Sequence, residues 1–257
     1  MLINTELFSA LGFSWNEKVT FPESPKLSPE RVCYNYKRML AEFVWDASYL
    51  EGNPYTYPEV KTLLEGITIG GHKLSDQEQI LCLAESAKKL IASVATNKFH
   101  FNKQTFCDHN KIIAIHEALD AGNFRGEAEE KNYTPQVALG IHGRYTPLPT
   151  IDGAPALNKT FTQAVNQLET DVSNKLQRGI LFSLHGALFQ YFFDGNKRTS
   201  RTMMNGILMS SGYDALSIPA SKAQEYNEKM VQFYLTRDAT QMLDFMKKLV
   251  PTITIKR

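Results

Sequence analysis

The stretch DGNKRTSR, residues 194–201, joins two apolar segments of helical periodicity. The first segment covers residues 180–193 and the second covers residues 199–211. Gly195 and Asn196 supply a tight turn between the two segments. The sequence therefore predicts two helices that meet at a short turn, with the N-terminus of the second helix beside that turn.

The start of the second helix is suited to phosphate. Its first backbone N–H groups have no partner within the helix. These donors, the positive end of the helix dipole and the guanidinium groups of Arg198 and Arg201 favour an anion. Asp194 adds a hard oxygen ligand for Mg²⁺ beside them. The alternative is an ordinary turn with solvated arginines. A Walker loop is excluded, because the strand, the first glycine and the Gly-Lys-Ser/Thr order are missing.

The longer stretch QYFFDGNKRTSR, residues 190–201, resembles the motif of the Fic family, His-Pro-Phe-x-Asp/Glu-Gly-Asn-Gly-Arg-x-x-Arg. Two positions depart from it. The family's catalytic histidine falls on Gln190, and its second glycine falls on Lys197. In Fic enzymes this histidine deprotonates a target hydroxyl, which then attacks the α-phosphate of ATP.

The resemblance also implies roles for the other residues of the motif. The backbone N–H groups of Gly195, Asn196 and Lys197 would form an anion hole, and Arg198 and Arg201 would neutralise the β- and γ-phosphates. The aspartate of the turn would ligate Mg²⁺. The family activity implied is protein adenylyltransferase activity (AMPylation), the transfer of AMP to a Ser, Thr or Tyr hydroxyl of a protein.

A second stretch, ASYLEGN, residues 47–53, resembles the inhibitory helix signature of Fic proteins, Ser/Thr-x-x-x-Glu-Gly/Asn, with Ala47 at the Ser/Thr position. Glycine commonly ends a helix, but a glutamate there opposes the helix dipole. In the family this glutamate pairs with the second arginine of the motif and blocks the γ-phosphate. The resemblance therefore implies that Glu51 pairs with Arg201, about 150 residues further on.

A third stretch, EALDAGNFR, residues 117–125, looks like the helix end and Gly-x-Phe/Tyr-Arg turn that precede the flap of Fic proteins. The flap is a hairpin that holds the target side chain as an added strand. Residues 136–150 occupy its place, and residues 137–141 and 144–146 have the pattern of two short strands. The resemblance implies an unknown target protein docked on this flap. The alternative is a surface hairpin without function.

Gln190 bears on whether the chain catalyses AMP transfer. A carboxamide forms hydrogen bonds but takes no proton near pH 7, and loss of a general base typically costs about 10²–10⁴-fold in rate. His185 is a poor substitute, because five residues along a helix turn its side chain about 140° away from that of Gln190. We expect His185 to be a core residue and AMP transfer to be weak or absent.

Several function classes stay open. The leading interpretation is an autoinhibited, Fic-like protein that binds ATP with Mg²⁺ and is related to AMP transferases. Gln190 favours a nucleotide-binding pseudoenzyme that acts as a regulator. Lys197 resembles the Asn-Lys-Arg of the Doc branch, which transfers the γ-phosphate, and this favours a phosphotransferase. A plain helical interaction module, such as a DNA-binding regulator, is disfavoured by the net charge of +1 and the lack of a basic terminal helix-turn-helix.

The chain as a whole has the pattern of a helical protein. Its 257 residues, 43% of them hydrophobic, suffice for a sizeable core. Apolar spacings of three and four predict an all-α fold, which the resemblance specifies as a Fic-fold helical bundle with a small β-hairpin flap. Capping boxes are expected at Thr56 and Ser75. Further helices are predicted over residues 28–50, 103–121, 156–173, 176–193, 221–235 and 240–249.

Three parts are expected along the chain. Residues 1–54 hold an N-terminal arm, irregular over residues 1–27 because of Pro22 and Pro25, and the inhibitory helix. Residues 55–220 form the Fic-like domain, and residues 221–257 form C-terminal helices packed on the same domain.

Composition disfavours several classes of partner. The net charge of +1 gives no electrostatic case for nucleic acid or an anionic membrane, and no apolar run of about 18 residues predicts a membrane span. Cys33, Cys82 and Cys107 lack metal-site spacing, so we expect buried, reduced thiols and a cytoplasmic protein. The N-terminal residues lack the pattern of a secretory signal. A homo-oligomer is compatible with the sequence.

Overall fold

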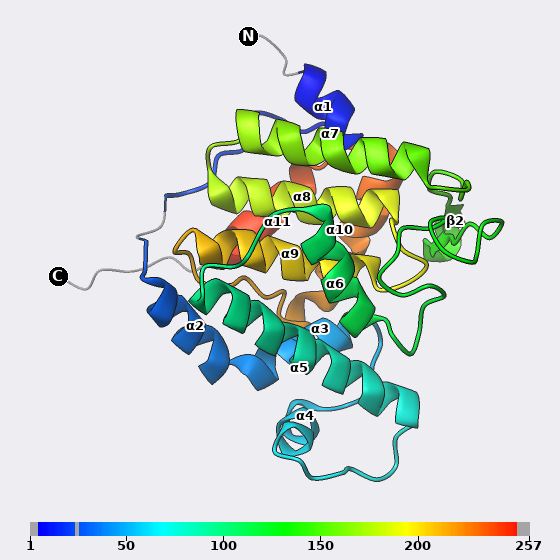
Figure 1. Cartoon of the computed structure of the whole chain (residues 1–257). Helices are drawn as coiled ribbons and strands as arrows, with labels where there is room; N and C mark the ends of the chain where they lie inside the picture. The colour runs from blue at the N-terminus through cyan, green and yellow to red at the C-terminus, as the bar shows by residue number, and fades with distance from the viewer. Residues whose placement is uncertain (1–4, 24–25, 251–257) are drawn as a thin grey trace.

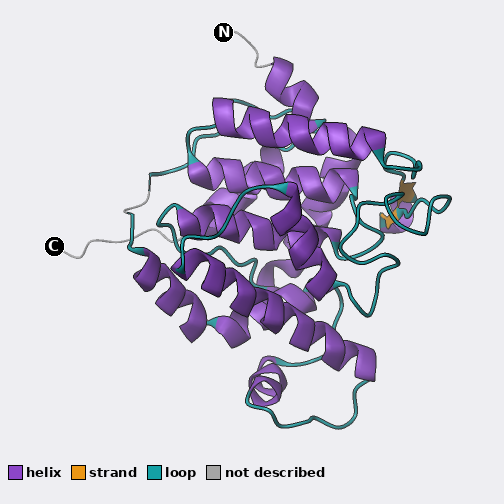
Figure 2. Ribbon diagram, viewed as in Figure 1, coloured by secondary structure: helices purple, strands orange, loops and turns teal. Residues whose placement is uncertain are grey.

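The computed structural model describes residues 5–23 and 26–250, and helices dominate that part of the chain (Figures 1 and 2). The predicted fold class, a helical bundle with one small hairpin, is confirmed. The elements are α1 (Thr5–Leu11), α2 (Pro29–Arg38), α3 (Leu40–Tyr49), α4 (Tyr57–Leu64), α5 (Leu74–Ala95), α6 (Lys103–Ile113), β1 (Val137–Ala138), η1 (Gly140–His142), β2 (Arg144–Tyr145), α7 (Pro155–Asp171), α8 (Lys175–Phe189), α9 (Asn196–Ser210), η2 (Ala220–Lys222), α10 (Ala223–Thr236) and α11 (Thr240–Leu249).

Helices α8 and α9 form the centre of the bundle. They pack along each other, with α7 against α8, α1 against α7, and α5 and α6 against α9 (Figure 1). Gly186 permits this close approach, because a Cβ there would lie 2.0 Å from Ser200 Oγ. The turn between α8 and α9, residues 190–195, is therefore mounted on two buried helices.

Aromatic side chains fill the core behind this turn. The Phe106 ring of α6 lies with its centroid 4.8 Å from that of Phe192, 5.6 Å from Phe161 and 5.8 Å from Tyr191. The ring of Phe124 packs 4.7 Å from that of Tyr191. Large buried rings carry much of the apolar burial of a core, so the residues just before the DGNKRTSR stretch have a dense base.

The helix predicted over residues 28–50 is two helices, and the single-helix prediction was wrong. Ser28 caps α2 as expected, with its Oγ accepting from Arg31 N at 3.3 Å. The backbone leaves helical geometry at Met39, with φ −102° and ψ 11°. The break lets α2 pack against α5 and α9 while α3 packs against α4 and α5.

Two predicted helix starts have different outcomes. The capping box of α4 is confirmed, because Thr56 N donates to Glu59 Oε2 at 2.8 Å. The box at Ser75 was wrong. Helix α5 begins at Leu74 after Lys73, which makes no side-chain cap, and Ser75 lies inside the helix.

The N-terminal arm contains a helix that the prediction of an irregular segment missed. Pro25, on which that prediction partly depended, lies outside the described residues. Helix α1 buries Leu7 and Leu11 and contacts α7 and α8. Tertiary packing of an apolar face stabilises short helices that local propensity alone does not.

Helix α6 ends at Ile113, eight residues before the predicted end, because the Asn110 side chain hydrogen-bonds to the segment that follows the helix and to the α8–α9 turn. Its Oδ1 accepts from Gly122 N at 3.0 Å, and its Nδ2 donates to Asp194 O at 3.0 Å. The segment after α6 therefore turns back toward the α8–α9 turn instead of continuing as a helix.

The predicted hairpin is present in shortened form. Val137 pairs with Tyr145 and Ala138 with Arg144, while residues 140–142 form the 3₁₀ turn η1. The first strand was expected to continue to Ile141, but Gly140, with φ +60°, takes the chain out of the extended region.

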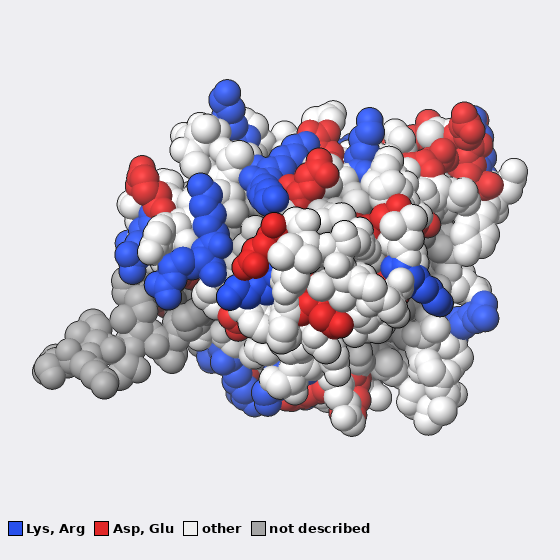
Figure 3. All heavy atoms as spheres, turned by 90° about the horizontal axis from the view of Figure 1, so that it is seen from below, with Lys and Arg blue, Asp and Glu red and all other residues white. Residues whose placement is uncertain are grey.

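The cysteines and the surface agree with a folded domain of mixed charge. Cys33 and Cys82 are buried, Cys107 is half-buried, and all three are free thiols. No helix in the described part of the chain has the length and apolarity needed to cross a bilayer. Basic and acidic side chains are interspersed on the face shown in Figure 3. The division into three parts along the chain stays a prediction.

Candidate functional site

Two residues with positive φ shape the turn between α8 and α9. Helix α8 ends at Phe189, four residues before the predicted end, because the next residue, Gln190, is left-handed with φ +50° and ψ +62°. Helix α9 begins at Asn196, three residues before the predicted start, and Gly195 with φ +74° is its N-cap. A Cβ at position 195 would lie 3.0 Å from Ala114 Cβ, so glycine suits both the conformation and the space.

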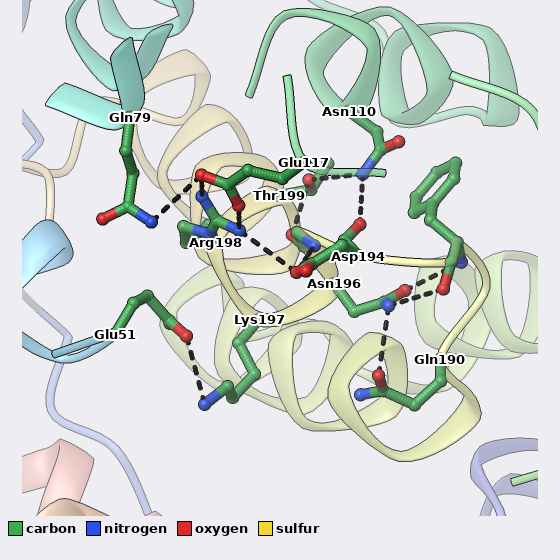
Figure 4. Close-up of polar contacts among 12 residues, drawn as sticks. Glu51, Gln79, Asn110, Glu117, Gln190, Asp194, Asn196, Lys197, Arg198 and Thr199 are labelled. Atoms are coloured by element: carbon green, nitrogen blue, oxygen red, sulfur yellow. Dashed lines mark hydrogen bonds and ion pairs between the residues drawn. The ribbon is translucent and has the colours of Figure 1, made fainter. Parts of the chain in front are cut away.

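The Asn196 side chain braces this turn from inside (Figure 4). Its Nδ2 donates to Phe192 O at 2.7 Å and to Gln190 Oε1 at 3.1 Å, and its Oδ1 accepts from Phe192 N at 2.9 Å. Sequence analysis gave Asn196 only a backbone role. Its buried amide also fixes where the turn and Gln190 lie.

Gln190 is buried, and its carboxamide is engaged at both ends. Nε2 donates to Ala187 O at 2.6 Å, while Oε1 accepts from Asn196. An amide held in this way has hydrogen-bonding capacity but takes up no proton near neutral pH.

The first N–H groups of α9 are open to a ligand. Thr199 N is the first to make an intrahelical bond, to Gly195 O at 2.8 Å. Within the described residues, no hydrogen bond uses the backbone N–H groups of Asn196, Lys197 or Arg198. These residues border a cavity of about 320 Å³, whose other walls are Glu51, Pro135, Gln136, Val137, Ala138, Gln190, Phe193, Asp194 and Gly195.

Glu51 lies just after α3 and reaches this helix start. Its Oε1 is 3.0 Å from Arg201 Nη2, and its Oε2 is 3.3 Å from Lys197 Nζ. The contact with Arg201 that the resemblance implied is present. We call these three residues the Glu51 latch. Burial raises the pKa of the Glu51 carboxyl, but the cations Lys197, Arg201 and Arg198 outweigh it and lower the pKa to about 2.

Arg198 is held on the other side of α9 by a residue that sequence analysis did not assign to the site (Figure 4). The Glu117 carboxylate accepts hydrogen bonds from both terminal nitrogens of Arg198, and the bond from Nη1 is 2.9 Å long. Gln79 Nε2 donates to the same carboxylate at 3.0 Å. Arg198 Nη2 also lies 3.1 Å from Asp194 Oδ1. Burial lowers the pKa of Arg198, but its carboxylate neighbours, Glu117 first, raise it overall.

Asp194 is suited to a weakly held Mg²⁺. Its side chain is 54% exposed, and its Oδ1 accepts from Gly195 N at 2.5 Å and from Arg198. No recorded contact within the described residues engages Oδ2. The described residues also contain no group of three or more His, Cys, Asp or Glu side chains placed to hold a metal. One carboxylate fits Mg²⁺, which keeps several waters and takes further ligands from substrate phosphates.

Comparisons with known proteins show which proteins share this fold. No protein-family model matches the chain. A solved fragment of Fic-1 from C. elegans superposes with a TM-score of 0.68 at 16% identity, over 97% of this chain and 69% of that one. A Fic domain containing signaling protein from Bacteroides thetaiotaomicron gives a TM-score of 0.67 at 17% identity, over 96% and 92%. These likenesses establish the fold.

Sequence similarity adds a curated relative. The protein adenylyltransferase Fic of Drosophila mojavensis is 24% identical over 192 residues, which cover 74% of this chain and 36% of the relative. The chain therefore has the fold of Fic proteins and is similar in sequence to Fic adenylyltransferases. It spans about a third of the length of the curated relatives that it matches.

The hairpin region expected to be the flap, residues 136–150, is anchored to the turn at Gln190 by Arg125, to which sequence analysis gave no role. Arg125 is fully buried, and its Nε donates to Gln190 O at 2.5 Å. Nη1 donates to Thr150 Oγ1 at 2.7 Å and Nη2 to Leu148 O at 3.0 Å. The arginine stood in the recognised turn before the flap, but its partners lie up to 65 residues away in the sequence.

His185 has the place in the core that its helical phase predicts. It is fully buried, with Nδ1 3.1 Å from Leu11 O and Nε2 2.6 Å from Tyr191 Oη. Burial lowers the pKa of His185 to about 4. This imidazole is therefore neutral near pH 7, and it is not among the residues that line the cavity at the start of α9.

Proposed function

We propose that this Fic protein binds ATP with Mg²⁺ at the start of α9 and is held in an autoinhibited state by the Glu51 latch. One observation carries the proposal: a carboxylate from another element neutralises two cations at a helix N-terminus that borders a cavity. Free N–H donors and clustered cations are what a polyphosphate requires. Asp194 would hold the metal, which would offset phosphate charge when bound.

The chemistry proposed is related to AMP transfer to protein hydroxyl groups. Support comes from the name of the curated relatives, protein adenylyltransferase. In that reaction a hydroxyl oxygen attacks the α-phosphate, the bond to the β-phosphate breaks, pyrophosphate leaves, and the hydroxyl proton passes to a base. Gln190 has no capacity to take that proton, so we propose that transfer is slow. The flap, residues 136–150, is the proposed dock for the target chain.

A nucleotide-binding pseudoenzyme is the second candidate, and the engaged amide of Gln190 favours it. Its Nε2 and Oε1 both have partners within the protein. A third candidate, Doc-like γ-phosphate transfer, has only the identity of Lys197 in its favour. ATP labelled at the α- or the γ-phosphate separates the three. An α-label on protein indicates AMP transfer, a γ-label phosphotransfer, and tight binding without either a pseudoenzyme.

Calorimetry with Mg²⁺ tests the proposal directly. Glu51→Gln should raise ATP affinity more than ADP affinity, because the carboxylate competes with the γ-phosphate. Glu42→Gln is the matched control, since Glu42 is an exposed carboxylate of helix α3, which precedes Glu51. The binding proposal fails if neither the wild type nor Glu51→Gln binds ATP. An equal gain for both nucleotides would make Glu51 a helix terminus without a gating role.

A further inference from the structure

An apolar pocket lies at the break between α2 and α3, where α2 forms an edge of the bundle (Figure 1). Its volume is about 330 Å³, and its apolar wall consists of Tyr36, Met39, Phe43 and Ala215. The rings of Tyr36 and Phe43 meet edge to face, with their centroids 4.6 Å apart. No residue of this pocket also lines the cavity at the start of α9, so the two are separate sites.

The apolar wall is open to solvent at Met39. This residue is 44% exposed, whereas proteins usually bury methionine. Its flexible thioether side chain adapts to apolar groups of different shape. The volume is at the lower end of the range for ligand pockets, and it suits one large apolar side chain.

The polar residues of the pocket differ in whether they have partners. Asn35 Nδ2 donates to Asp214 Oδ1 at 2.8 Å, so the carboxylate and the amide are joined. Arg38 lines the same pocket, and no hydrogen bond or ion pair among the described residues engages its guanidinium group. Such a guanidinium is suited to a bidentate bond with a carboxylate. Arg31 and Lys37 are further exposed cations of the same ten-residue helix.

We propose that this pocket, which we call the α2–α3 pocket, docks an acidic peptide segment of a partner protein. One bulky apolar side chain of the segment fills the pocket, and a neighbouring carboxylate binds Arg38. Charge complementarity carries the proposal, because Arg38 is a cation without a partner at the border of an open apolar surface. Asp214 repels a carboxylate, so the acidic residue lies toward Arg38. The proposal is independent of the nucleotide site.

The shape of the pocket favours a peptide over an anionic membrane. Tyr36 and Ala215 are buried in the pocket wall, 8% and 9% exposed, and do not protrude as membrane-inserting side chains do. The acidic residues Glu30 and Glu42 also lie on α2 and α3 and weaken attraction to a charged surface. A concave apolar site with one cation instead matches a single side chain and its acidic neighbour.

Fluorescence anisotropy with three labelled hexapeptides tests the proposal. The first contains a phenylalanine followed by two glutamates, the second has lysines in place of the glutamates, and the third has alanine in place of the phenylalanine. The wild-type protein should bind the first peptide saturably and at least about tenfold more tightly than either of the others. No saturable binding of the first peptide below about 1 mM, or equal binding of all three, overturns the proposal.

Substitutions then assign the binding to the pocket. Arg38→Gln should weaken binding of the first peptide about tenfold, the scale of one charged hydrogen bond. Met39→Ser should weaken it several-fold through lost apolar contact, and serine suits this position because Met39 is the N-cap of α3. Arg31→Gln is the matched control, an exposed cation of α2 that does not line the pocket, and it should change affinity less than about twofold. Equal losses in Arg31→Gln and Arg38→Gln would mean a general charge effect and would overturn the proposal. Thermal unfolding shows that the variants compared are folded.

Two further measurements test the other occupants. Wild-type protein should not cosediment with vesicles of phosphatidylserine and phosphatidylcholine, and sedimentation velocity should show no self-association that Met39→Ser abolishes. Vesicle binding that Arg38→Gln removes would make a lipid surface the occupant. Self-association that depends on Met39 would make a second copy of this chain the occupant. Either result would overturn the peptide proposal.

Discussion

At the scale of one residue, Gln190 shows that a side chain can support the structure of a motif without being able to accept a proton. The backbone there is left-handed, and the side chain completes hydrogen bonds with Ala187 and Asn196. Glutamine therefore supports the turn, and its amide takes up no proton near pH 7. Sequence resemblance located this position, but only the structure shows that both ends of the amide are engaged.

Gln190→His should restore AMP transfer to the protein's own hydroxyl groups, most visibly with Glu51→Gly. The gain could approach about 10²-fold, the lower range for general-base catalysis. Histidine is among the residues that tolerate positive φ. Incorporation of α-labelled ATP over time measures the gain, with γ-labelled ATP run in parallel.

Gln190→Asn is the matched control, because it keeps an amide that takes no proton. Lys197→Gly belongs to the same series, since it restores the family residue. Robust AMP transfer by the wild type would mean that another group is the base. A triple variant that binds ATP and stays inert would mean that Gln190 is not the only missing part.

Glu51 gives a pH-dependent prediction. Its pKa in the folded protein is about 2, below the ordinary value of 4.5. A lowered pKa adds stability that is present above pH 4.5 and is lost as the pH falls toward 2. Glu51→Gln should therefore cost up to about 3 kcal/mol of unfolding free energy at pH 7 and much less at pH 3. Urea unfolding at both pH values measures this, and a difference from wild type that stays constant between them contradicts it.

Individual side-chain contacts were predictable from the sequence only where both partners belong to recognised motifs. The pairing of Glu51 with Arg201, 150 residues further along the chain, followed from two recognised stretches. The pairing of Glu117 with Arg198 did not, because nothing in the sequence marks one carboxylate among many as the partner of an arginine 81 residues away. The contact of Lys197 with Glu51 also required coordinates, since a long side chain reaches in several directions.

At the scale of elements, helical periodicity predicted which segments are helices, and special backbone positions decided where they end. Helix α11 has the predicted bounds, residues 240–249. Helix α8 stops early at the left-handed Gln190, and α6 stops early where Asn110 bonds to Gly122. These ends depend on tertiary hydrogen bonds, which a local pattern does not contain.

The flap depends on one buried cation. Arg125 has no recorded carboxylate partner in the described part of the chain and donates instead to Gln190 O, Leu148 O and Thr150 Oγ1. Arg125→Met keeps much of the side-chain volume but leaves these buried acceptors without a donor. It should lower the unfolding free energy by about 3 kcal/mol or more.

The same change should speed hydrogen–deuterium exchange at the flap amides. Arg144→Met is the control, because Arg144 is an exposed cation of strand β2. Equal exchange rates in the two variants would show that Arg125 does not hold the flap to the motif.

At the scale of the whole molecule, the candidate site lies on the rim of the aromatic core. The core extends from α1 to α11 and includes Leu11, Phe106 and Leu243. Composition predicted a core of this size, but not that its rings would gather behind residues 190–196. A site built on a dense base keeps its atoms in place.

Phe106→Ala tests how far that base supports the site. Phe106 is fully buried among five other aromatic rings, so its removal should lower the unfolding free energy by about 3–5 kcal/mol through lost burial and a residual cavity. Urea unfolding measures the loss. Ile141→Ala is the control, because Ile141 is 97% exposed at the flap tip, and it should change stability by less than about 0.5 kcal/mol. At a urea concentration where Phe106→Ala remains folded, its ATP affinity should also fall. Tyr191 and Phe192, which belong to the α8–α9 turn, pack against the Phe106 ring that this variant removes. A loss of stability with unchanged affinity would mean that the Asn196 brace alone maintains the turn.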